Sequence, residues 1–233
     1  MSRVNKILNQ KIWDTLCDDD ECGEFHVEIK PEIRKALIKI AYDFLSFLDA
    51  KIPFKDITIT GSMANFNYTD QSDIDLHIIF DFSNQPDLLE ELMQAKRKIW
   101  NDDHEITIKG HDVEMYPQSS AEPHHSSGVF SVIRNRWNEI PTRTNPSIDE
   151  ELVLKKSEDL IQRIDFLDSR EDRTTALRKT KDKIGKMRRA GLEREGEYSV
   201  ENLVFKMLRN TGYLEKLNVI IKNDYDHSVS LDQ

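Results

Sequence analysis

The spacing of apolar residues shifts along the chain from a helical period to a strand period and then back again. In residues 31–49 apolar side chains recur at helical spacing, which predicts an amphipathic helix with Pro31 in its first turn. Residues 56–60 alternate apolar and polar side chains, and residues 73–80 continue as an apolar-rich run. Both patterns are typical of strands, so we predict a helix followed by two strands.

A second helix and a hairpin are predicted in the middle of the chain. Residues 87–100 return to the helical period. The apolar positions of this helix are Leu88, Leu92, Ala95 and Ile99. Residues 105–109 and 112–116 have strand patterns on either side of Gly110, which predicts a hairpin, and residues 128–133 predict a further short strand.

The C-terminal part of the chain has a different pattern. From about residue 134 the pattern changes, and Pro141, Asn145 and Pro146 mark a linker-like stretch. Helix-patterned segments follow at residues 148–168, 171–190 and 199–222. The polar tail from Asp224 is expected to be loose.

These patterns together predict an α+β protein with two parts. The N-terminal sequence MSRVNKILNQKIWDTL lacks a continuous apolar stretch, so it is interpreted as an amphipathic helix and not as a secretory signal. We expect residues 1–135 to form a core, a mixed sheet with flanking and N-terminal helices. We expect residues 136–233 to form a helical module.

Composition narrows the classes of function that the chain can have. The chain has 233 residues, of which 38% are hydrophobic and 33% charged, and its net charge is −10. No apolar run is long enough for a membrane span, so we expect a cytoplasmic protein that does not bind membranes. A net negative charge excludes a general nucleic-acid coat protein, because the phosphate backbone favours cationic proteins. Cys17 and Cys22 are interpreted as reduced thiols.

Two aspartates in the second predicted strand carry the first chemical signal. Asp73 and Asp75 are two positions apart, so both carboxylates leave the same face of a strand. Paired carboxylates repel each other, and a hard divalent cation such as Mg²⁺ removes that cost. We expect a third acid from a neighbouring strand. Glu114, which has apolar neighbours, is preferred over Asp112, which lies on the same face.

The turn before these aspartates carries the second signal. Gly61 and Ser62 follow the first predicted strand and precede a short helix at about residues 63–65. Glycine allows the backbone to approach a phosphate closely, and backbone N–H groups with the serine hydroxyl can then bind triphosphate oxygens. Neither feature alone is specific, but the combination with the aspartates predicts a metal–nucleotide site.

The order of these features resembles that of a known superfamily. The segment ITITGSMANFNYTDQSDIDLHIIFD resembles the signature of the DNA polymerase beta-like nucleotidyltransferases, a strand with Gly-Ser and then Asp-apolar-Asp. HDVEMY is similar to their third-acid strand. The chain departs from many members in residues 63–67, where those carry another glycine or an arginine. The segment EGEYSVENLVFKMLRNTGYLEKL is similar to nucleotidyltransferase-like proteins of tailed phages, which would place the protein in the host cytoplasm.

The resemblance implies an activity and a set of ligands. It implies a mixed sheet, two Mg²⁺ ions (for which Mn²⁺ can substitute) held by Asp73, Asp75 and Glu114, and distal phosphates bound by Gly61 and Ser62. The implied reaction transfers the NMP group of a nucleoside triphosphate, ATP being one candidate, to a hydroxyl. The acceptor classes left open are an RNA end, a second nucleotide, a protein and a small molecule.

Cations and histidines outside this segment supply further candidates. Residues 178–194 concentrate positive charge, and such runs are usually solvated helix faces. We nevertheless expect Lys183 and Lys206 to bind the triphosphate or an RNA acceptor. His124 and His125 follow the third-acid strand, with no role that the sequence assigns.

Aromatic residues near the motifs are interpreted as core. These are Tyr116, Phe130 and Trp137, for which the alternative is base stacking. The rival functions are a catalytically silent nucleotide-binding regulatory module, and a partner-binding member of a toxin–antitoxin-type pair. The oligomeric state is not predicted.

Overall fold

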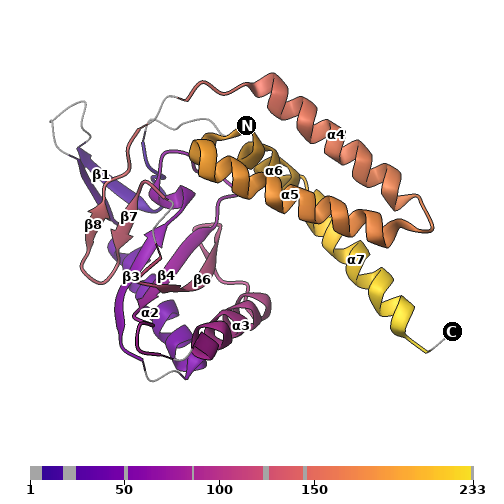
Figure 1. Ribbon diagram of the computed structural model, residues 1–233. Helices are drawn as coiled ribbons and strands as arrows, with labels where there is room; N and C mark the ends of the chain where they lie inside the picture. The colour runs from indigo at the N-terminus through magenta and orange to yellow at the C-terminus, as the bar shows by residue number, and fades with distance from the viewer. Residues whose placement is uncertain are drawn as a thin grey trace. The chain divides into compact units, whose positions relative to one another are not determined.

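The computed structural model describes residues 7–17, 25–49, 52–85, 87–122, 126–143 and 146–231. The chain divides into two compact units, Ser2–Thr144 and Asn145–Gln233, and most of their helices and strands are labelled in Figure 1. The first unit carries the strands and the second carries only helices among its described residues. The α+β class is therefore confirmed.

The first unit is built on a mixed six-stranded sheet with the strand order β5-β6-β4-β3-β7-β8. Its strands are β3 (Phe54–Thr60), β4 (Ile74–Phe80), β5 (Thr107–Ile108), β6 (His111–Ser119), β7 (Val129–Ser131) and β8 (Arg136–Glu139). β4 is parallel to β6 and antiparallel to β3, and β5 and β6 form the predicted hairpin. Among its described residues, the α-helices of this unit are α2 (Pro31–Leu48) and α3 (Asp87–Asp103), and both were predicted.

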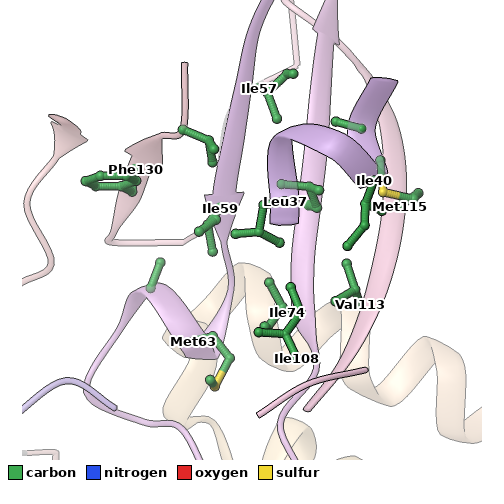
Figure 2. Close-up of a cluster of buried hydrophobic side chains, with 14 of the residues drawn as sticks. Leu37, Ile40, Ile57, Ile59, Met63, Ile74, Ile108, Val113, Met115 and Phe130 are labelled. Atoms are coloured by element: carbon green, nitrogen blue, oxygen red, sulfur yellow. The ribbon is translucent and has the colours of Figure 1, made fainter. Parts of the chain in front are cut away.

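The strand register separates an apolar face of this sheet from a polar one. Ile59 pairs with Leu76, and Leu76 pairs with Met115, so three buried apolar side chains lie side by side. Figure 2 shows these strands packed with α2, whose residues Leu37 and Ile40 lie in the same cluster. Because side chains alternate along a strand, the residues between them face the opposite side of the sheet.

The predicted N-terminal helix is wrong for the residues that the structure describes. Residues 10–12 form a turn, and β1 (Trp13–Cys17) pairs antiparallel with β2 (His26–Ile29). Residues 1–6 and Cys22 lie outside the described residues. Trp13 is 1% exposed and its indole Nε1 donates to the carbonyl oxygen of Met63 at 2.8 Å. This tertiary contact, together with burial of Ile12, outweighs the local amphipathic pattern.

One strand in the chain after residue 134 was not predicted from the sequence. Arg136–Glu139 forms β8, which pairs antiparallel with β7 at the edge of the sheet. Its side chains are exposed except for the partly buried Trp137. An edge strand with this little burial has no apolar alternation, so its sequence resembles a linker.

The second unit contains helices α4 (Glu150–Asp168), α5 (Arg173–Glu195), α6 (Val200–Asn210) and α7 (Tyr213–Val229). They share a separate apolar core that includes Ile164, Leu177 and Leu208. The predicted helix at 199–222 is two helices, because Gly212 adopts a left-handed conformation (φ +76°) between them. Among the described residues, no helix is long and apolar enough to cross a membrane.

The tail that was expected to be loose from Asp224 is helical as far as Val229. The Asp224 carboxylate accepts hydrogen bonds from Arg173 Nη2 at 2.8 Å and from Thr174 Oγ1 at 2.8 Å. These contacts from α5 hold the last turns of α7, although the sequence there is polar.

Candidate active site

The polar face of the sheet brings the predicted acids to one end of β4 and β6. Thr60 of β3 pairs with Asp75, and Asp75 pairs with Glu114 of β6, so the three side chains lie in one row across neighbouring strands. Asp73 comes two residues earlier, directly before β4 begins. All three acids are partly buried. Asp112, the competing acid, is exposed and pairs with Thr107 of β5.

Gly61 brings the predicted phosphate turn into direct contact with this row. Its φ is +70°, a conformation that L side chains rarely adopt. A β-carbon at position 61 would come within 2.0 Å of Oδ2 of Asp75. The backbone therefore approaches the carboxylate closely only because residue 61 has no side chain. The short 3₁₀ helix Ser62–Ala64 follows at once, close to the predicted short helix.

Residues from distant parts of the first unit hold this turn in place. Trp13 donates to the carbonyl of Met63, as described above. A β-carbon on Gly128 would meet the Ala64 carbonyl oxygen at 1.9 Å, so the chain before β7 packs directly against the turn. Ser126 Oγ bonds to the carbonyl oxygens of Gly61 at 3.4 Å and Gly128 at 3.0 Å. The turn is thus a rigid part of the fold and not a free loop.

A buried histidine supports the chain directly before Asp73. His111 is 1% exposed, and its Nδ1 lies 2.8 Å from the carbonyl oxygen of Ser72. A carbonyl oxygen only accepts, so Nδ1 carries a proton and donates it. Nε2 lies 3.2 Å from Nδ2 of Asn9. The histidine therefore connects β6 to the N-terminal segment and to the backbone that carries Asp73.

Glu114 has a partner that the sequence analysis assigned to the core. The hydroxyl of Tyr116 donates a hydrogen bond to Oε2 of Glu114. Burial, followed by the nearby Asp75 and Glu114 carboxylates, raises the pKa of Tyr116 well above its ordinary value. Tyr116 therefore stays protonated and remains a donor to Glu114. The prediction that Tyr116 is a core residue is wrong, because it lies on the polar face two positions from Glu114.

The Tyr116 ring is itself held between two other side chains. The His77 ring stacks on it with centroids 4.9 Å apart and planes 18° apart. The Arg97 guanidinium of α3 lies 4.7 Å from its centroid. His77 Nδ1 lies 2.7 Å from Oε1 of Gln118, farther along the same face of β6. The donor to Glu114 is thus fixed by packing on both sides.

The remaining residues that were singled out from the sequence lie outside this row of acids. Phe130 and Trp137 are confirmed as core residues, since both pack against Trp13 with ring centroids 5.0 and 4.8 Å away. Lys183 and Lys206 belong to α5 and α6 of the second unit. Lys183 lines a hollow of about 500 Å³ whose other lining residues are Lys179, Asp182, Lys186, Met187 and Ala190. His124 and His125 lie outside the described residues.

The donor chemistry of the row fits a hard divalent cation, although its side chains do not converge as a metal cage. Within the described ranges, no group of three or more His, Cys, Asp or Glu side chains could hold a metal ion as placed. Asp75 and Glu114 are nevertheless strand neighbours, and both offer only oxygen ligands. Carboxylate oxygens of this kind leave coordination positions that phosphate oxygens and water can fill on a hard divalent cation.

The residues that support the site were less predictable from the sequence than the acids and the turn that form it. Tyr116 was detectable, because it shares the period-two face of Glu114. Ser126 and Gly128 carry no local signal for packing on a turn more than sixty positions earlier in the chain. Trp13 was missed because its segment was interpreted as a helix.

Comparison with known proteins gives one match. The family model of the nucleotidyltransferase domain matches residues 41–134, a range that includes the turn, Asp73, Asp75 and Glu114. No curated protein and no solved structure shows a significant match.

Proposed function

Because residues 41–134 form a nucleotidyltransferase domain of the polymerase beta-like superfamily, we propose that this chain is an active, Mg²⁺-dependent enzyme. It transfers the NMP group of a nucleoside triphosphate to a hydroxyl acceptor and releases pyrophosphate. We propose an RNA end or a second nucleotide as the acceptor. The experiment below distinguishes these two acceptors from a hydroxyl group of a protein or of a small molecule.

The observation that carries this proposal is the pairing of Asp75 with Glu114 beside the Gly61 turn. A carboxylate pair on adjacent strands has no structural use on a polar face, where it adds like-charge repulsion. The repulsion becomes useful when the pair binds a cation.

Each residue of the row has a distinct role in this proposal. Asp73, Asp75 and Glu114 hold the divalent ions, and Tyr116 keeps the Glu114 carboxylate oriented. When bound, Mg²⁺ lowers the pKa of the acceptor hydroxyl and neutralises charge on the departing pyrophosphate. Ser62 and the backbone N–H groups of its turn bind the distal phosphates. Catalysis then comes mainly from positioning and from charge neutralisation.

The second unit supplies cations in this proposal. Lys183 and Lys206 bind phosphate groups of the triphosphate or of an RNA acceptor. Alanine at both positions is expected to raise the KM for the nucleotide or for the RNA, with less effect on kcat. If that variant binds the nucleotide and RNA as tightly as the wild type does, neither lysine takes part in phosphate binding.

The test is transfer of label from each α-³²P-labelled NTP with Mg²⁺, in the presence and absence of total RNA. Asp73→Asn and Asp75→Asn are expected to reduce transfer by about a thousandfold or more, because the ions lose their shared ligands. Asp70→Asn is the matched control, since Asp70 lies in the same loop and is exposed. Normal transfer by either site variant would exclude the mechanism.

The position of the label identifies the acceptor and also tests the rival. Label in RNA, in a dinucleotide, in protein or in a small product assigns the acceptor class directly. Binding of an NTP with no transfer to any acceptor would instead establish a silent nucleotide-binding module.

A further inference from the structure

Helix α3 exposes a continuous apolar stripe on the first unit. Leu88 is 73% exposed, Leu92 51% and Ile99 51%, and Ala95 between them is also exposed. These four positions follow one another at spacings of four, three and four residues, so they lie on one face over three turns. Single exposed apolar residues are common, but an aligned series of this length marks an interaction surface.

This stripe is not the face by which α3 packs on the core of its own unit. Met93, which is 1% exposed, and Trp100, which is 7% exposed, belong to that core, and Trp100 contacts the Phe44 and Phe47 rings of α2. A neighbouring face holds the outer edge of β6, where Asn101 bonds to both N and O of Met115 and Gln94 donates to the carbonyl of Pro117. The helix is therefore already anchored on two sides. The apolar positions from which α3 was predicted are those of the stripe, and they are not the residues that make these contacts.

The charges beside the stripe indicate what covers it. Glu91 and Lys98 are seven residues apart and both are exposed, so they flank the stripe on the same side. In an antiparallel pair of such helices, Leu92 meets Ala95 of the second copy and Leu88 meets its Ile99. Glu91 then lies opposite Lys98 of the second copy, and the pairing occurs twice because of the twofold symmetry. In a parallel pair these flanks lie on opposite sides of the interface, so Glu91 does not meet Lys98 of the second copy.

We infer that the α3 stripe binds the same stripe of a second copy of this chain, with the two helices antiparallel about a twofold axis. The stripe is self-complementary in shape and charge, as a twofold interface requires. One helix on each side is a small interface, so the dimer is weak and depends on protein concentration. The proposed active site lies on the polar face of the sheet and takes no residue from this stripe.

The test is sedimentation equilibrium of the full chain at protein concentrations up to about 1 mM, the range in which small interfaces associate. Wild-type protein is expected to form dimers. Leu92→Gln should weaken dimerisation about tenfold or more, because it places a polar group in the centre of the stripe. Val219→Gln is the matched control, since Val219 is 48% exposed on α7 and should leave dimerisation unchanged.

Charge reversal tests the antiparallel register separately. Glu91→Lys alone and Lys98→Glu alone each place like charges at both pairings, so each should dimerise about tenfold less tightly. An equimolar mixture of these two variants restores both opposite-charge pairings and should dimerise like the wild type, as should the double variant. Circular dichroism of each variant checks that α3 and the fold are retained.

Three results would overturn the inference. A monomeric wild type at the highest concentration would do so, as would a dimer that Leu92→Gln leaves intact. If both variants are folded and their mixture still does not dimerise like the wild type, the proposed antiparallel dimer is excluded.

Discussion

Gly61 and Asp75 are in such close contact that a β-carbon on residue 61 would lie 2.0 Å from the Asp75 carboxylate oxygen Oδ2. Gly61 directly follows the end of β3, and Asp75 lies near the start of β4. Their contact therefore joins the predicted phosphate turn to the predicted metal ligand. The turn and the acid are therefore one structural unit. A substitution at either residue should therefore displace the other.

Gly61→Ala is expected to slow NMP transfer strongly. The new methyl group forces Asp75 or the turn to move, and it also strains a backbone at φ +70°. Transfer should fall by about a hundredfold or more, since displacement of a catalytic group by about 1 Å has effects of that size. The measurement is the steady-state rate of label transfer from NTP together with the thermal midpoint of unfolding.

Gly110→Ala is the matched control for this prediction. Gly110 has φ +85° and no atom within 4 Å of an added β-carbon, so its alanine variant suffers the backbone strain without the collision. Both variants should lose about 1–2 kcal/mol of stability from strain. If the two variants also kept the same activity, the contact between Gly61 and Asp75 would have no role in catalysis.

Tyr116→Phe is expected to lower kcat about tenfold and to leave the KM for the nucleotide nearly unchanged. The substitution removes the hydroxyl that donates to Glu114 and keeps the ring that stacks on His77. A hydrogen bond to a charged group contributes about 1.5–3 kcal/mol, part of which solvent recovers.

Steady-state kinetics at several Mg²⁺ concentrations measure this effect. Tyr213→Phe removes a comparable hydroxyl, which donates to Asp165 at 3.0 Å in the second unit, and should leave kcat intact. Equal kcat for wild type and Tyr116→Phe across that range would show that Glu114 needs no such support.

Asp56→Asn is expected to destabilise the first unit by about 1–3 kcal/mol, the cost of a buried polar group with a mismatched partner. The Asp56 carboxylate is 6% exposed and accepts from the Ser131 hydroxyl at 2.7 Å, Ile57 N at 2.9 Å and Asn138 Nδ2 at 3.1 Å. An asparagine side chain has a single acceptor oxygen, and an NH₂ donor takes the place of the other, so at least one donor loses its acceptor. Urea unfolding measures the change, and the exposed Asp43 supplies the control Asp43→Asn. Equal stability of the two variants would contradict the argument.

Asp224→Asn is expected to destabilise the second unit at pH 7 and to have less effect in acid. The hydrogen bond from Arg173 lowers the pKa of Asp224. A carboxyl whose pKa is lower in the folded state stabilises the protein above its unfolded pKa of about 3.9, and this contribution is lost as the pH falls through the folded value. Because Asp224 and Arg173 are partly exposed, the loss at pH 7 should be about 1 kcal/mol.

Urea unfolding at pH 7 and at pH values from 5 down to 3 follows this difference. The more exposed pair of Arg170 and Asp172 supplies the control Asp172→Asn, which should change stability little at any pH. A difference between Asp224→Asn and wild type that stayed constant through the acid range would rule out a contribution from the ionised carboxylate.

The candidate site was predictable where the chemistry is local. Asp75 lies in β4 and Asp73 directly precedes that strand, which is the place that the apolar pattern predicted, and Gly61 and Ser62 follow the end of β3. Glu114 required an assumption about which strand neighbours β4. The parallel pairing of β4 with β6 supplied that neighbour, and no residue within either strand encodes it alone.

Helix α3 illustrates the difference between predicting an element and predicting its surroundings. Its helical period was correct, since Leu88, Leu92, Ala95 and Ile99 lie on one face. The same residues are exposed, while Met93 and Trp100 are buried. An amphipathic pattern indicates that a face is apolar and does not indicate what covers it.

The sequence by itself determined the class of the fold, the helices and strands with strong periods, and the acids and the turn that suggest nucleotidyl transfer. These depend on side chains that are close in the chain, where backbone geometry sets their relative positions. Only the tertiary structure decided that residues 13–17 form a strand, that Tyr116 supports Glu114, and that Gly61 touches Asp75. Those relationships join distant segments, so packing and hydrogen bonding of the whole unit select them over local propensity.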